Sequence, residues 1–339
     1  MRILTTTSAT DPPSIGPCAG VGPRPRISVM VPSHEPDERL CQTLESVLAQ
    51  AEGPEAMQIT VVDDASQPGR TSRLVQAVDA QGRVEVVECR QRLGLSGNWN
   101  RAIELARGHL VHLLHQDDYV MPGFYSRILR GFDRSPAVGM AFCRARIVDG
   151  DDQLIKLASR LQWLPGVIAN WLPAIAERQR VQTPCAIVAR AAYETVGGYR
   201  SDLRHALDWE MWVRIATRFS VWYDPRPLAS YRRHEANETA RLAASGEVWP
   251  DMARAIAVIA ASLPAPVRDR AVTASSRWCA ASALRTATRQ IAAGRLAAAA
   301  ATLAAVPTIL DQGGGGDVAT RRRLAALQAR VAQQSRRAA

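Results

Sequence analysis

Four short apolar segments, each followed by a polar loop and a helical pattern of apolar residues, succeed one another in residues 26–120. The first is a nearly uninterrupted apolar run, which is typical of a strand covered on both faces. Strand–helix alternation with short connections requires right-handed crossovers and so predicts an α/β fold with a parallel sheet. The expected strands are Ile27–Val31, Ile59–Val62, Val84–Val87 and Leu110–Leu114, with helices after Pro36, near 70–79, over 98–106 and after Pro122.

The rest of the chain is less regular. Residues 1–25 are rich in Thr, Ser, Pro and Gly and predict a disordered leader. Beyond residue 120 we expect strands over 138–145, 185–188 and 220–223 and a strong helix over 206–218. A compact α/β domain is expected to end near residue 240. Residues 241–339 are rich in Ala and Arg and predict helices with a frayed basic end, interrupted at Pro264, Pro266, Pro307 and Gly313–Gly316.

The positive charge is concentrated at the C-terminal end. The net charge is +10, but residues 241–339 alone hold 14 arginines against five acidic residues. Residues 1–240 are therefore close to neutral, and the basic composition does not mark the whole chain as a nucleic-acid binder. No nucleic-acid partner is expected.

Six cysteines lie far apart, with no CxxC or Cys/His ligand spacing, so neither a disulfide framework nor a zinc site is expected. No basic stretch followed by an apolar core opens the chain, and the apolar run from Leu296 to Leu310 is too short to span a bilayer. A cytoplasmic protein is expected.

Acidic pairs follow two of the expected strands. Asp63-Asp64 ends the second strand and Asp117-Asp118 follows the fourth, while the first ends in Ser33-His34-Glu35. In an open parallel sheet, ligands bind beyond the carboxyl ends of the strands. Neighbouring carboxylates repel unless a cation or a hydrogen-bond donor compensates them. Either pair alone could cap the following helix, but two pairs at one edge favour a ligand site.

The loop after the first strand lacks two common nucleotide-binding motifs, which limits the classes of ligand that this edge can bind. The turn after the first strand, Pro32-Ser33-His34-Glu35-Pro36, has no glycine and so cannot be a dinucleotide fingerprint, and the single lysine, Lys156, rules out a phosphate-loop lysine there. Carboxylates can hold a diphosphate through a divalent cation, and oxygen ligands favour Mg²⁺ or Mn²⁺. A metal-bound nucleotide diphosphate is the ligand that these features favour.

With these motifs in order, the sequence resembles the family 2 glycosyltransferases, which have the GT-A fold, an α/β/α sandwich that binds a nucleotide sugar. The resemblance covers about residues 26–236. It is carried by the strings Ile27–Ser33, Val61–Ser66, Gly94–Asn100, His115–Asp118, Thr183–Cys185, Gly197–Tyr199, Leu207–Trp212 and Tyr231–His234. It implies a nucleotide-binding half over 26–120 and an acceptor half over 121–240.

The resemblance also implies roles for single residues. Ser33, His34, Glu35 and Asp64 would hold the nucleoside, Asp63 would shape that pocket, and Asn98 would lie near the nucleotide sugar. Asp118, with Asp117 beside it, matches the end of the metal-binding aspartate motif, and His115 stands where the family often has Asp. His234 matches a late histidine that approaches the metal or the diphosphate in some relatives; a loop or core histidine is the alternative.

Asp208 is the implied general base of an inverting transfer, with Mn²⁺ or Mg²⁺ as cofactor. Its alternative role is a carboxylate at a helix N-terminus. Trp209, Met211 and Trp212 would either line an acceptor site or pack in the core. A retaining mechanism needs a second carboxylate, and Glu210 lies about 200° round the helix from Asp208.

The implied partners are a UDP-, dTDP- or GDP-sugar donor and a saccharide, lipid-linked or small-molecule acceptor. A peripheral membrane contact through the arginine-rich C-terminus is a further expectation. The alternative from another class is a basic membrane-surface or nucleic-acid binding protein without transfer activity. A nucleotidyltransferase is disfavoured because the 33–36 turn offers no basic glycine-rich loop.

Overall fold

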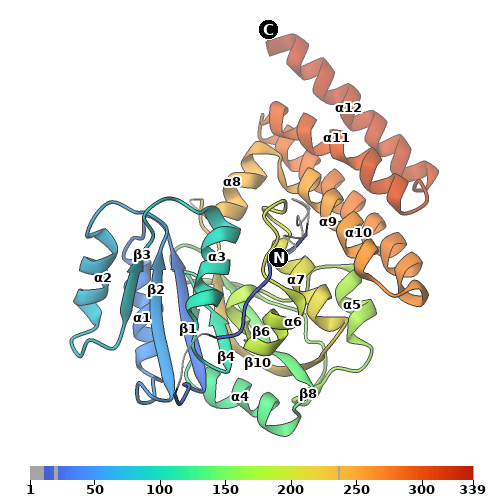
Figure 1. The fold of residues 1–339 in the computed structure, drawn as a ribbon. Coiled ribbons are helices and arrows are strands. Elements are labelled where there is room, and N and C mark those ends of the chain that lie inside the picture. Colours follow the sequence, from blue (N-terminus) through green and yellow to red (C-terminus); the bar gives the residue numbers. More distant parts are fainter. Residues whose placement is uncertain (1–10, 19–21, 236, 339) are drawn as a thin grey trace, which may run out of the picture. The chain divides into compact units, whose positions relative to one another are not determined.

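Strand β1 (Ile27–Ser33) lies between two other strands of the sheet, and all seven of its residues are buried (Figure 1). The computed structural model describes residues 11–18, 22–235 and 237–338. Strands β2 (Met57–Asp63) and β4 (Leu110–Leu113) flank β1 in parallel, and β3 (Glu85–Glu88) pairs in parallel with β2. The four strands expected from residues 26–120 therefore form one parallel half-sheet.

The sheet continues beyond β4 with strands from the second half of the chain. β9 (Ala186–Ala189) lies antiparallel between β4 and β6 (Val138–Val148), and β10 (Ser220–Arg232) runs parallel to β6. Three short antiparallel strands complete the ten-stranded sheet, whose order is β3-β2-β1-β4-β9-β6-β10-β5. They are β5 (Tyr119–Val120) and β8 (Gly166–Val167) on β10 and β7 (Leu154–Leu157) on β6.

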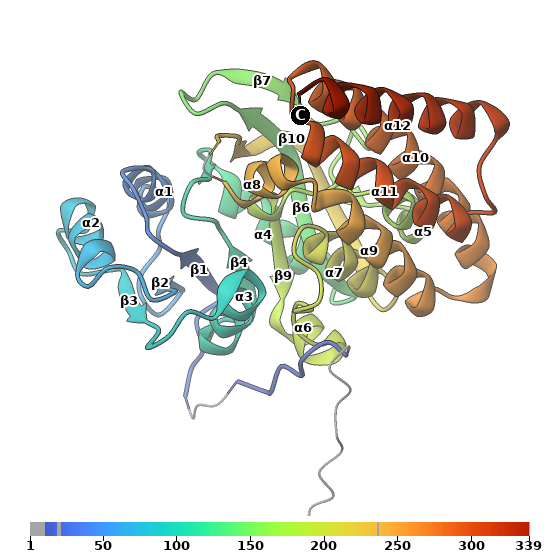
Figure 2. The ribbon, with the colours of Figure 1, turned by 90° about the horizontal axis from the view of Figure 1, so that it is seen from above.

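Helices cover both faces of this sheet, as Figure 2 shows. On one face α1 (Arg39–Leu48), α2 (Arg70–Val78) and α4 (Phe124–Arg134) share a core with alternate residues of β1 and β2. On the other face lie α3 (Gly94–Leu105) and α6 (Arg190–Val196). The predicted α/β/α sandwich with a mostly parallel sheet is confirmed.

Three boundaries in this part of the chain differ from the sequence prediction. Helix α3 begins at Gly94, although Gly94–Gly97 was expected to be a loop, because the carboxylate of Asp64, the residue after β2, caps its N-terminus. β6 runs on to Val148 and β10 to Arg232, since their parallel pairing continues past Pro225 and Pro227 through shifts of register. A short 3₁₀ turn, η1 (Thr183–Cys185), precedes β9.

Part of the segment predicted as a disordered leader is ordered. Ile15 is 4% exposed, the carbonyl of Pro13 accepts from the N–H of Gly198 (2.7 Å), and that of Gly16 accepts from Arg190 (3.1 Å). Arg24 donates to the carbonyl of Arg107 at 2.8 Å. These bonds anchor residues 11–18 and 22–25, while 1–10 and 19–21 lie outside the described residues.

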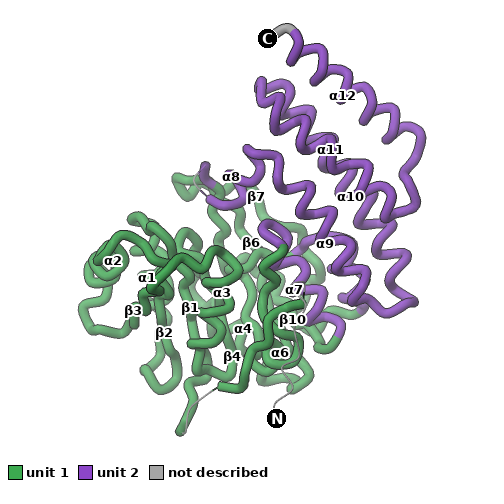
Figure 3. The backbone as a smooth tube through the Cα atoms, turned by 45° about the horizontal axis from the view of Figure 1, so that its top comes forward, with its two compact units in different colours: residues 1–169, 181–202, 218–233 green, residues 170–180, 203–217, 234–339 purple. Residues whose placement is uncertain are grey.

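The chain forms two compact units, coloured in Figure 3, which are not separated by a single point in the sequence. The sheet and its covering helices belong to residues 1–169, 181–202 and 218–233. The second unit comprises 170–180, 203–217 and 234–339, so α5 (Trp171–Glu177) and α7 (Leu207–Ala216) belong with the C-terminal helices. The domain boundaries expected near residues 25 and 240 stay predictions.

Five helices make up the rest of the second unit, and small residues bring them close together. A Cβ at Gly246 would meet Ala298 and Ala301 at 2.8 Å, and one at Gly313 would meet Ser276 at 2.5 Å. The helices are α8 (Glu238–Ser245), α9 (Val248–Ser262), α10 (Ala265–Ala292), α11 (Leu296–Gln312) and α12 (Val318–Ala338).

Two expectations for these helices are corrected. Pro307 lies inside α11 rather than ending it, because α11 packs against α9 and α10 and buries residues both before and after the proline. The basic end is not frayed through 318–338, since α12 is helical there and buries Leu324, Leu327 and Val331. Among the described residues, no helix combines the length and apolar character that crossing a bilayer requires. All six cysteines are free, as expected.

Candidate functional site

The carboxyl ends of β1, β2 and β4 meet at one edge of the sheet. Ser33, the last residue of β1, pairs with Asp63, the last residue of β2, and Met30 pairs with Leu113 at the end of β4. The loops that follow these strands therefore start side by side. They contain most of the residues that the sequence marks as candidates.

Gln116 ties two of these loops together. Its Oε1 accepts from Ser33 Oγ (2.7 Å) and from the N–H of His34 (2.9 Å), and its Nε2 donates to the carbonyl of His34 (3.1 Å). His34 Nδ1 in turn lies 2.9 Å from the carbonyl oxygen of Asp64. Sequence reasoning overlooked Gln116, although it lies within the His115–Asp118 string.

Asp63 and Asp64 are both buried, and each uses its carboxylate within the protein. Asp63 accepts from the N–H of Ser66 (3.1 Å), from the Ser66 hydroxyl and from Thr71 Oγ1 (2.9 Å), so it stabilises the turn before α2. Asp64 accepts from the N–H groups of Leu93 (2.6 Å) and Gly94 (2.9 Å), one on each oxygen. Asp64 therefore caps α3, not the helix that directly follows its own strand.

Asn98 and Glu35 complete this part of the edge. Asn98 is buried, and its amide nitrogen donates to the carbonyls of Ser33 (3.3 Å) and Val62 (3.1 Å), so it clamps the ends of β1 and β2. Glu35 has a left-handed backbone, with φ of 45°, and its half-exposed carboxylate pairs with Arg70 at 3.2 Å. Glu35 also accepts from the N–H of Gln67 at 2.8 Å.

Asp118 is the most deeply buried acid of the loop after β4, with a fully buried side chain. Its Oδ1 accepts from the N–H of Arg232 (2.8 Å), and its Oδ2 lies 3.2 Å from Nδ1 of His115. Burial and the neighbouring carboxylate of Asp117 raise the pKa of Asp118 to about 6, and the contact with His115 opposes this rise. The His115 ring stacks on Trp99, with 4.8 Å between centroids.

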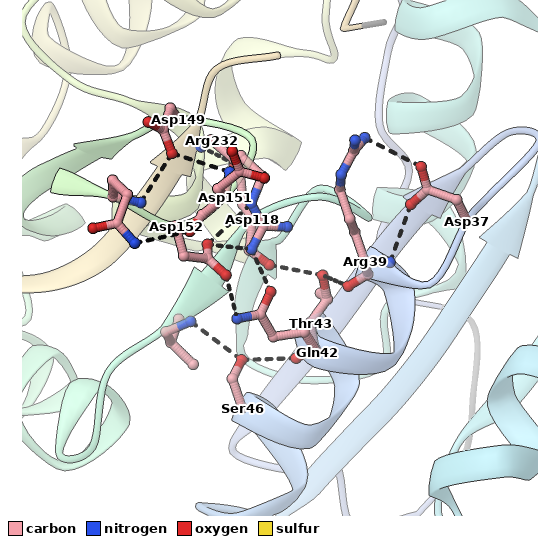
Figure 4. Close-up of polar contacts among 12 residues, drawn as sticks. Asp37, Arg39, Gln42, Thr43, Ser46, Asp118, Asp149, Asp151, Asp152 and Arg232 are labelled. Carbon is pink, nitrogen blue, oxygen red and sulfur yellow. Dashed lines mark hydrogen bonds and ion pairs between the residues drawn. The ribbon is translucent and has the colours of Figure 1, made fainter. Parts of the chain in front are cut away.

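A network of long side chains holds the backbone around Asp118 (Figure 4). Arg232 donates from Nη2 to Asp152 at 2.5 Å and also bonds Gln42, which donates to Asp152 at 3.0 Å. Partial burial would raise the pKa of Asp152, but the bonds from Arg232 and Gln42 hold it below its usual range. Thr43 Oγ1 lies 2.7 Å from the carbonyl oxygen of Asp118 and can donate its hydrogen there.

The side chains of His115, Asp117 and Asp118 fit a divalent cation. One ligand atom from each can be chosen so that all lie within 4.8 Å of one another. A buried carboxylate whose charged form is disfavoured by desolvation and by a second carboxylate gains from a cation beside it. The two carboxylates supply oxygen ligands of the kind that a hard divalent cation prefers, and the imidazole supplies one nitrogen.

Two predicted site residues belong to the second unit. Asp208 lies in the first turn of α7, half-buried, and its Oδ1 accepts from the N–H of Trp209 at 2.6 Å. His234 follows the end of β10 by two residues. The structure brings Ser33, His34, Glu35, Asp63, Asp64, Asn98, Asp117 and Asp118 to the sheet edge. The roles of these residues, like those of Asp208 and His234, stay predictions.

The neighbours of Asp208 on α7 are core residues. Trp209 and Trp212 are each 1% exposed and Met211 is fully buried, and Trp209 Nε1 donates to the carbonyl of Ile175 at 2.7 Å. Of the two alternatives, core packing is the one observed. Glu210 is also buried and forms a two-pronged ion pair with Arg214, with both contacts at 2.8 Å.

A further acid, Asp251 of α9, holds the chain that leads into α7. Its Oδ1 accepts from the N–H of Arg204 (3.1 Å), and its Oδ2 accepts from those of His205 (2.8 Å) and Ala206 (2.9 Å). Asp251 is 5% exposed. Sequence reasoning missed this residue because its partners lie 45 to 47 positions away.

Comparisons with known proteins identify relatives of the chain. The model of the family described as "Glycosyl transferase family 2" matches residues 28–197. The Mycobacterium tuberculosis protein MT1568, described as uncharacterized, is 30% identical over 233 residues, which are 66% of this chain and 72% of that protein. The succinoglycan biosynthesis protein ExoU of Rhizobium meliloti is 27% identical over 30% of this chain and 29% of its own length.

Solved structures share the fold at low sequence identity. Residues 1–349 of S. aureus TarS, in complex with UDP-GlcNAc, superpose with a TM-score of 0.64 at 16% identity, covering 92% of each chain. The mannosyltransferase PcManGT from Pyrobaculum calidifontis, in complex with GDP-Man and Mn²⁺, gives a TM-score of 0.55 at 18% identity over 96% of this chain and 84% of that one.

Proposed function

Since the chain belongs to glycosyl transferase family 2 and is a glycosyltransferase, we propose that it moves a sugar from a nucleotide-diphosphate sugar to an acceptor hydroxyl with inversion. The main support for a donor site is the buried Asp118 carboxylate, which lies beside His115 and Asp117 at the carboxyl edge of the sheet. The complexes of TarS with UDP-GlcNAc and of PcManGT with GDP-Man support a UDP- or GDP-sugar, and a dTDP-sugar is the third candidate.

The nucleoside would lie against Ser33, His34 and Glu35, with Asn98 near the sugar. Asp63 and Asp64 would act mainly by shaping this pocket, since their carboxylates accept hydrogen bonds from the turn before α2 and from the start of α3. Each carboxylate oxygen can accept a second hydrogen bond, so Asp64 keeps the capacity to accept one from a base. The rigid link through Gln116 would keep these loops in place before the donor binds.

Asp118, with His115 and Asp117, would hold the divalent cation, and His234 is a further proposed ligand. A bound Mn²⁺ or Mg²⁺ supplies positive charge that offsets the charge developing on a departing diphosphate. The Arg232 N–H holds the Asp118 carboxylate, and the Thr43 hydroxyl holds the backbone carbonyl of Asp118. Little reorganisation of the protein would then accompany binding.

Asp208 is the proposed general base. The acceptor oxygen attacks the anomeric carbon as the bond from that carbon to the diphosphate oxygen breaks, and Asp208 takes the acceptor's proton. One displacement inverts the anomeric configuration. A double displacement needs a second carboxylate, and Glu210 is engaged in its ion pair with Arg214.

The base is tested with Asp208→Asn, and with Asp269→Asn at an exposed site on α10 as the matched control. We expect Asp208→Asn to lower kcat about 100-fold or more while the donor dissociation constant stays unchanged. The control should retain wild-type kcat. Wild-type turnover by Asp208→Asn would remove this residue from the mechanism.

The cation site is tested by titrating UDP into wild type and Asp118→Asn, with and without Mn²⁺. We expect Mn²⁺ to tighten UDP binding to the wild type and to Asp133→Asn, an exposed control, but not to Asp118→Asn. Equal tightening in all three proteins would exclude Asp118 as a ligand.

The proposal extends to the acceptor and to the cellular compartment. A saccharide, a lipid-linked saccharide or a small molecule would be the acceptor, and the protein would act in the cytoplasm. The contact between the arginine-rich C-terminus and a membrane stays a prediction, which sedimentation of the Arg321→Gln/Arg322→Gln/Arg323→Gln variant with anionic vesicles tests.

A further inference from the structure

Exposed apolar side chains gather in one short segment of the first unit. Eight large hydrophobic side chains are exposed among the described residues, and five of them lie between 154 and 167. Trp163 is 80% exposed and Leu164 77%, more than any of the others. The five residues are Leu154, Ile155, Trp163, Leu164 and Val167. Trp163, Leu164 and Val167 lie within five positions of one another, which marks this turn, rather than scattered surface residues, as a candidate interaction surface.

The most exposed pair lies on a turn that the fold holds in place. Gln162 Nε2 donates to the carbonyls of Leu164 (2.8 Å) and Gly166 (3.1 Å), which closes the turn. The chain that leaves the turn is held by β8, which pairs with β10. It is also held by the N–H of Ile168, which donates to the carbonyl of Val221 at 2.9 Å. Trp163 and Leu164 are therefore presented to solvent by a defined backbone.

Positive charge accompanies these apolar side chains. The Arg160 guanidinium lies over the Trp163 ring, 4.1 Å from its centroid. Arg144 and Arg160, with Leu161, Gln162 and Trp163, line an open hollow of about 360 Å³. From residue 154 to residue 169 the chain carries two cations, Lys156 and Arg160, and no acidic residue.

We propose that Arg144, Arg160, Trp163, Leu164 and Val167, the Trp163 surface, dock the protein on an anionic lipid surface. Tryptophan prefers the boundary between headgroups and acyl chains, and Leu164 beside it adds apolar area that enters that boundary. The two arginines face the phosphates, and the hollow between them takes an anionic headgroup. This proposal concerns attachment and does not depend on the proposed reaction.

A protein partner is the less suitable occupant. A stable protein interface buries about 800 Å² on each side and takes some 20–30 residues, whereas the apolar part of this surface is a few side chains on one turn. A lipid surface needs only a few inserted residues because it adapts its shape to them. The combination of apolar tips and flanking cations without acids matches an anionic bilayer.

The full-length protein is sedimented with vesicles of equimolar phosphatidylglycerol and phosphatidylcholine, and with vesicles of phosphatidylcholine alone. We expect binding to the first, and at least about tenfold weaker binding to the second. Trp163→Ala/Leu164→Ser should weaken binding to anionic vesicles about tenfold or more, and Arg160→Gln about fivefold, since one surface cation contributes about that factor.

Two matched controls separate this surface from the C-terminal helix. Val318→Ser removes another strongly exposed apolar side chain, 67% exposed on α12, and should bind vesicles like the wild type. Arg321→Gln/Arg322→Gln/Arg323→Gln should retain most of the binding. Wild-type binding by Trp163→Ala/Leu164→Ser, no binding by the wild type, or loss of binding only in the triple-arginine variant would each overturn the proposal.

Sedimentation velocity without lipid tests the alternative of a second copy. The wild type and Trp163→Ala/Leu164→Ser should sediment as the same species. Dissociation of an oligomer in the variant would assign the surface to a protein interface instead. Since both side chains are exposed, the variant should show wild-type circular dichroism, which verifies that it folds.

Discussion

Asp251→Asn should destabilise the second unit and lower the rate of transfer. The Asp251 carboxylate is buried and accepts three consecutive main-chain N–H groups, from residues 204, 205 and 206, just before α7 begins at Leu207. An anion at this end of α7 also interacts favourably with the helix dipole. Asparagine has nearly the same shape but only one acceptor oxygen, so its NH₂ group must face one of the three N–H groups.

The magnitude follows from these three contacts. A hydrogen bond to a charged acceptor contributes about 1.5–3 kcal/mol, and a buried donor left without a partner costs about 1–3 kcal/mol. In Asp251→Asn one of these bonds is lost, and the other two have a neutral instead of a charged acceptor. The free energy of unfolding should therefore fall by about 2–4 kcal/mol. For a unit of this size the Tm should fall by about 5–15 °C.

Thermal unfolding followed by circular dichroism measures this change, with Asp311→Asn at the exposed end of α11 as the matched control. Because α7 carries the proposed base Asp208, kcat should fall more than the donor KM changes. A Tm within about 1 °C of the wild type would contradict this account of the α7 cap, since a surface substitution shifts stability by only about 0.5 kcal/mol.

Three further predictions concern the first unit. A Cβ at Gly108 would lie 2.5 Å from the backbone nitrogen of Ser28 and 2.6 Å from the carbonyl carbon of Ile27. Gly108→Ala should therefore cost about 1–3 kcal/mol in urea unfolding; Gly16→Ala, with nothing within 4 Å of the new Cβ, should cost far less. Burial lowers the pKa of His112 from 6.5 to about 4. The unfolded chain thus binds a proton between these pH values that the folded protein does not, so stability should fall by about 3 kcal/mol as the pH drops from 6.5 to 4. A His112→Gln variant with the same pH dependence in urea titrations would refute this. Asp64→Asn, which places an amide against the N–H of Leu93 or Gly94, should increase hydrogen exchange at the start of α3, and unchanged exchange there would show that this cap is dispensable.

The sequence predicted the parallel half of the sheet because each of its strands can be recognised from neighbouring residues in the chain. β1 is buried along its whole length and so reads as an apolar run, and the acids after β2 and β4 stand out because they directly follow such runs. Parallel topology then places their loops at one edge without further information. Asp118 could be predicted for this reason, and the structure adds that its carboxylate is fully buried beside His115.

What the sequence did not predict depends on partners distant in the chain. Helix α3 starts at Gly94 because Asp64, some 30 residues earlier, accepts its first N–H groups. β10 continues past two prolines because β6 continues beside it. Gln116, Arg232 and Asp251 have no local signature of their roles, since each acts through backbone groups or side chains that only the folded chain brings near.

Titration calorimetry of UDP-, dTDP- and GDP-sugars in the presence and absence of Mn²⁺ tests the donor site most directly. We expect at least one of these sugars to bind the wild-type protein with an affinity that rises when the cation is added. Asp118→Asn should lose that rise and Asp133→Asn should keep it. A metal-dependent donor site at this edge of the sheet would be contradicted if the affinity changed neither with the cation nor with Asp118→Asn. It would also be contradicted if none of the three nucleotide sugars bound.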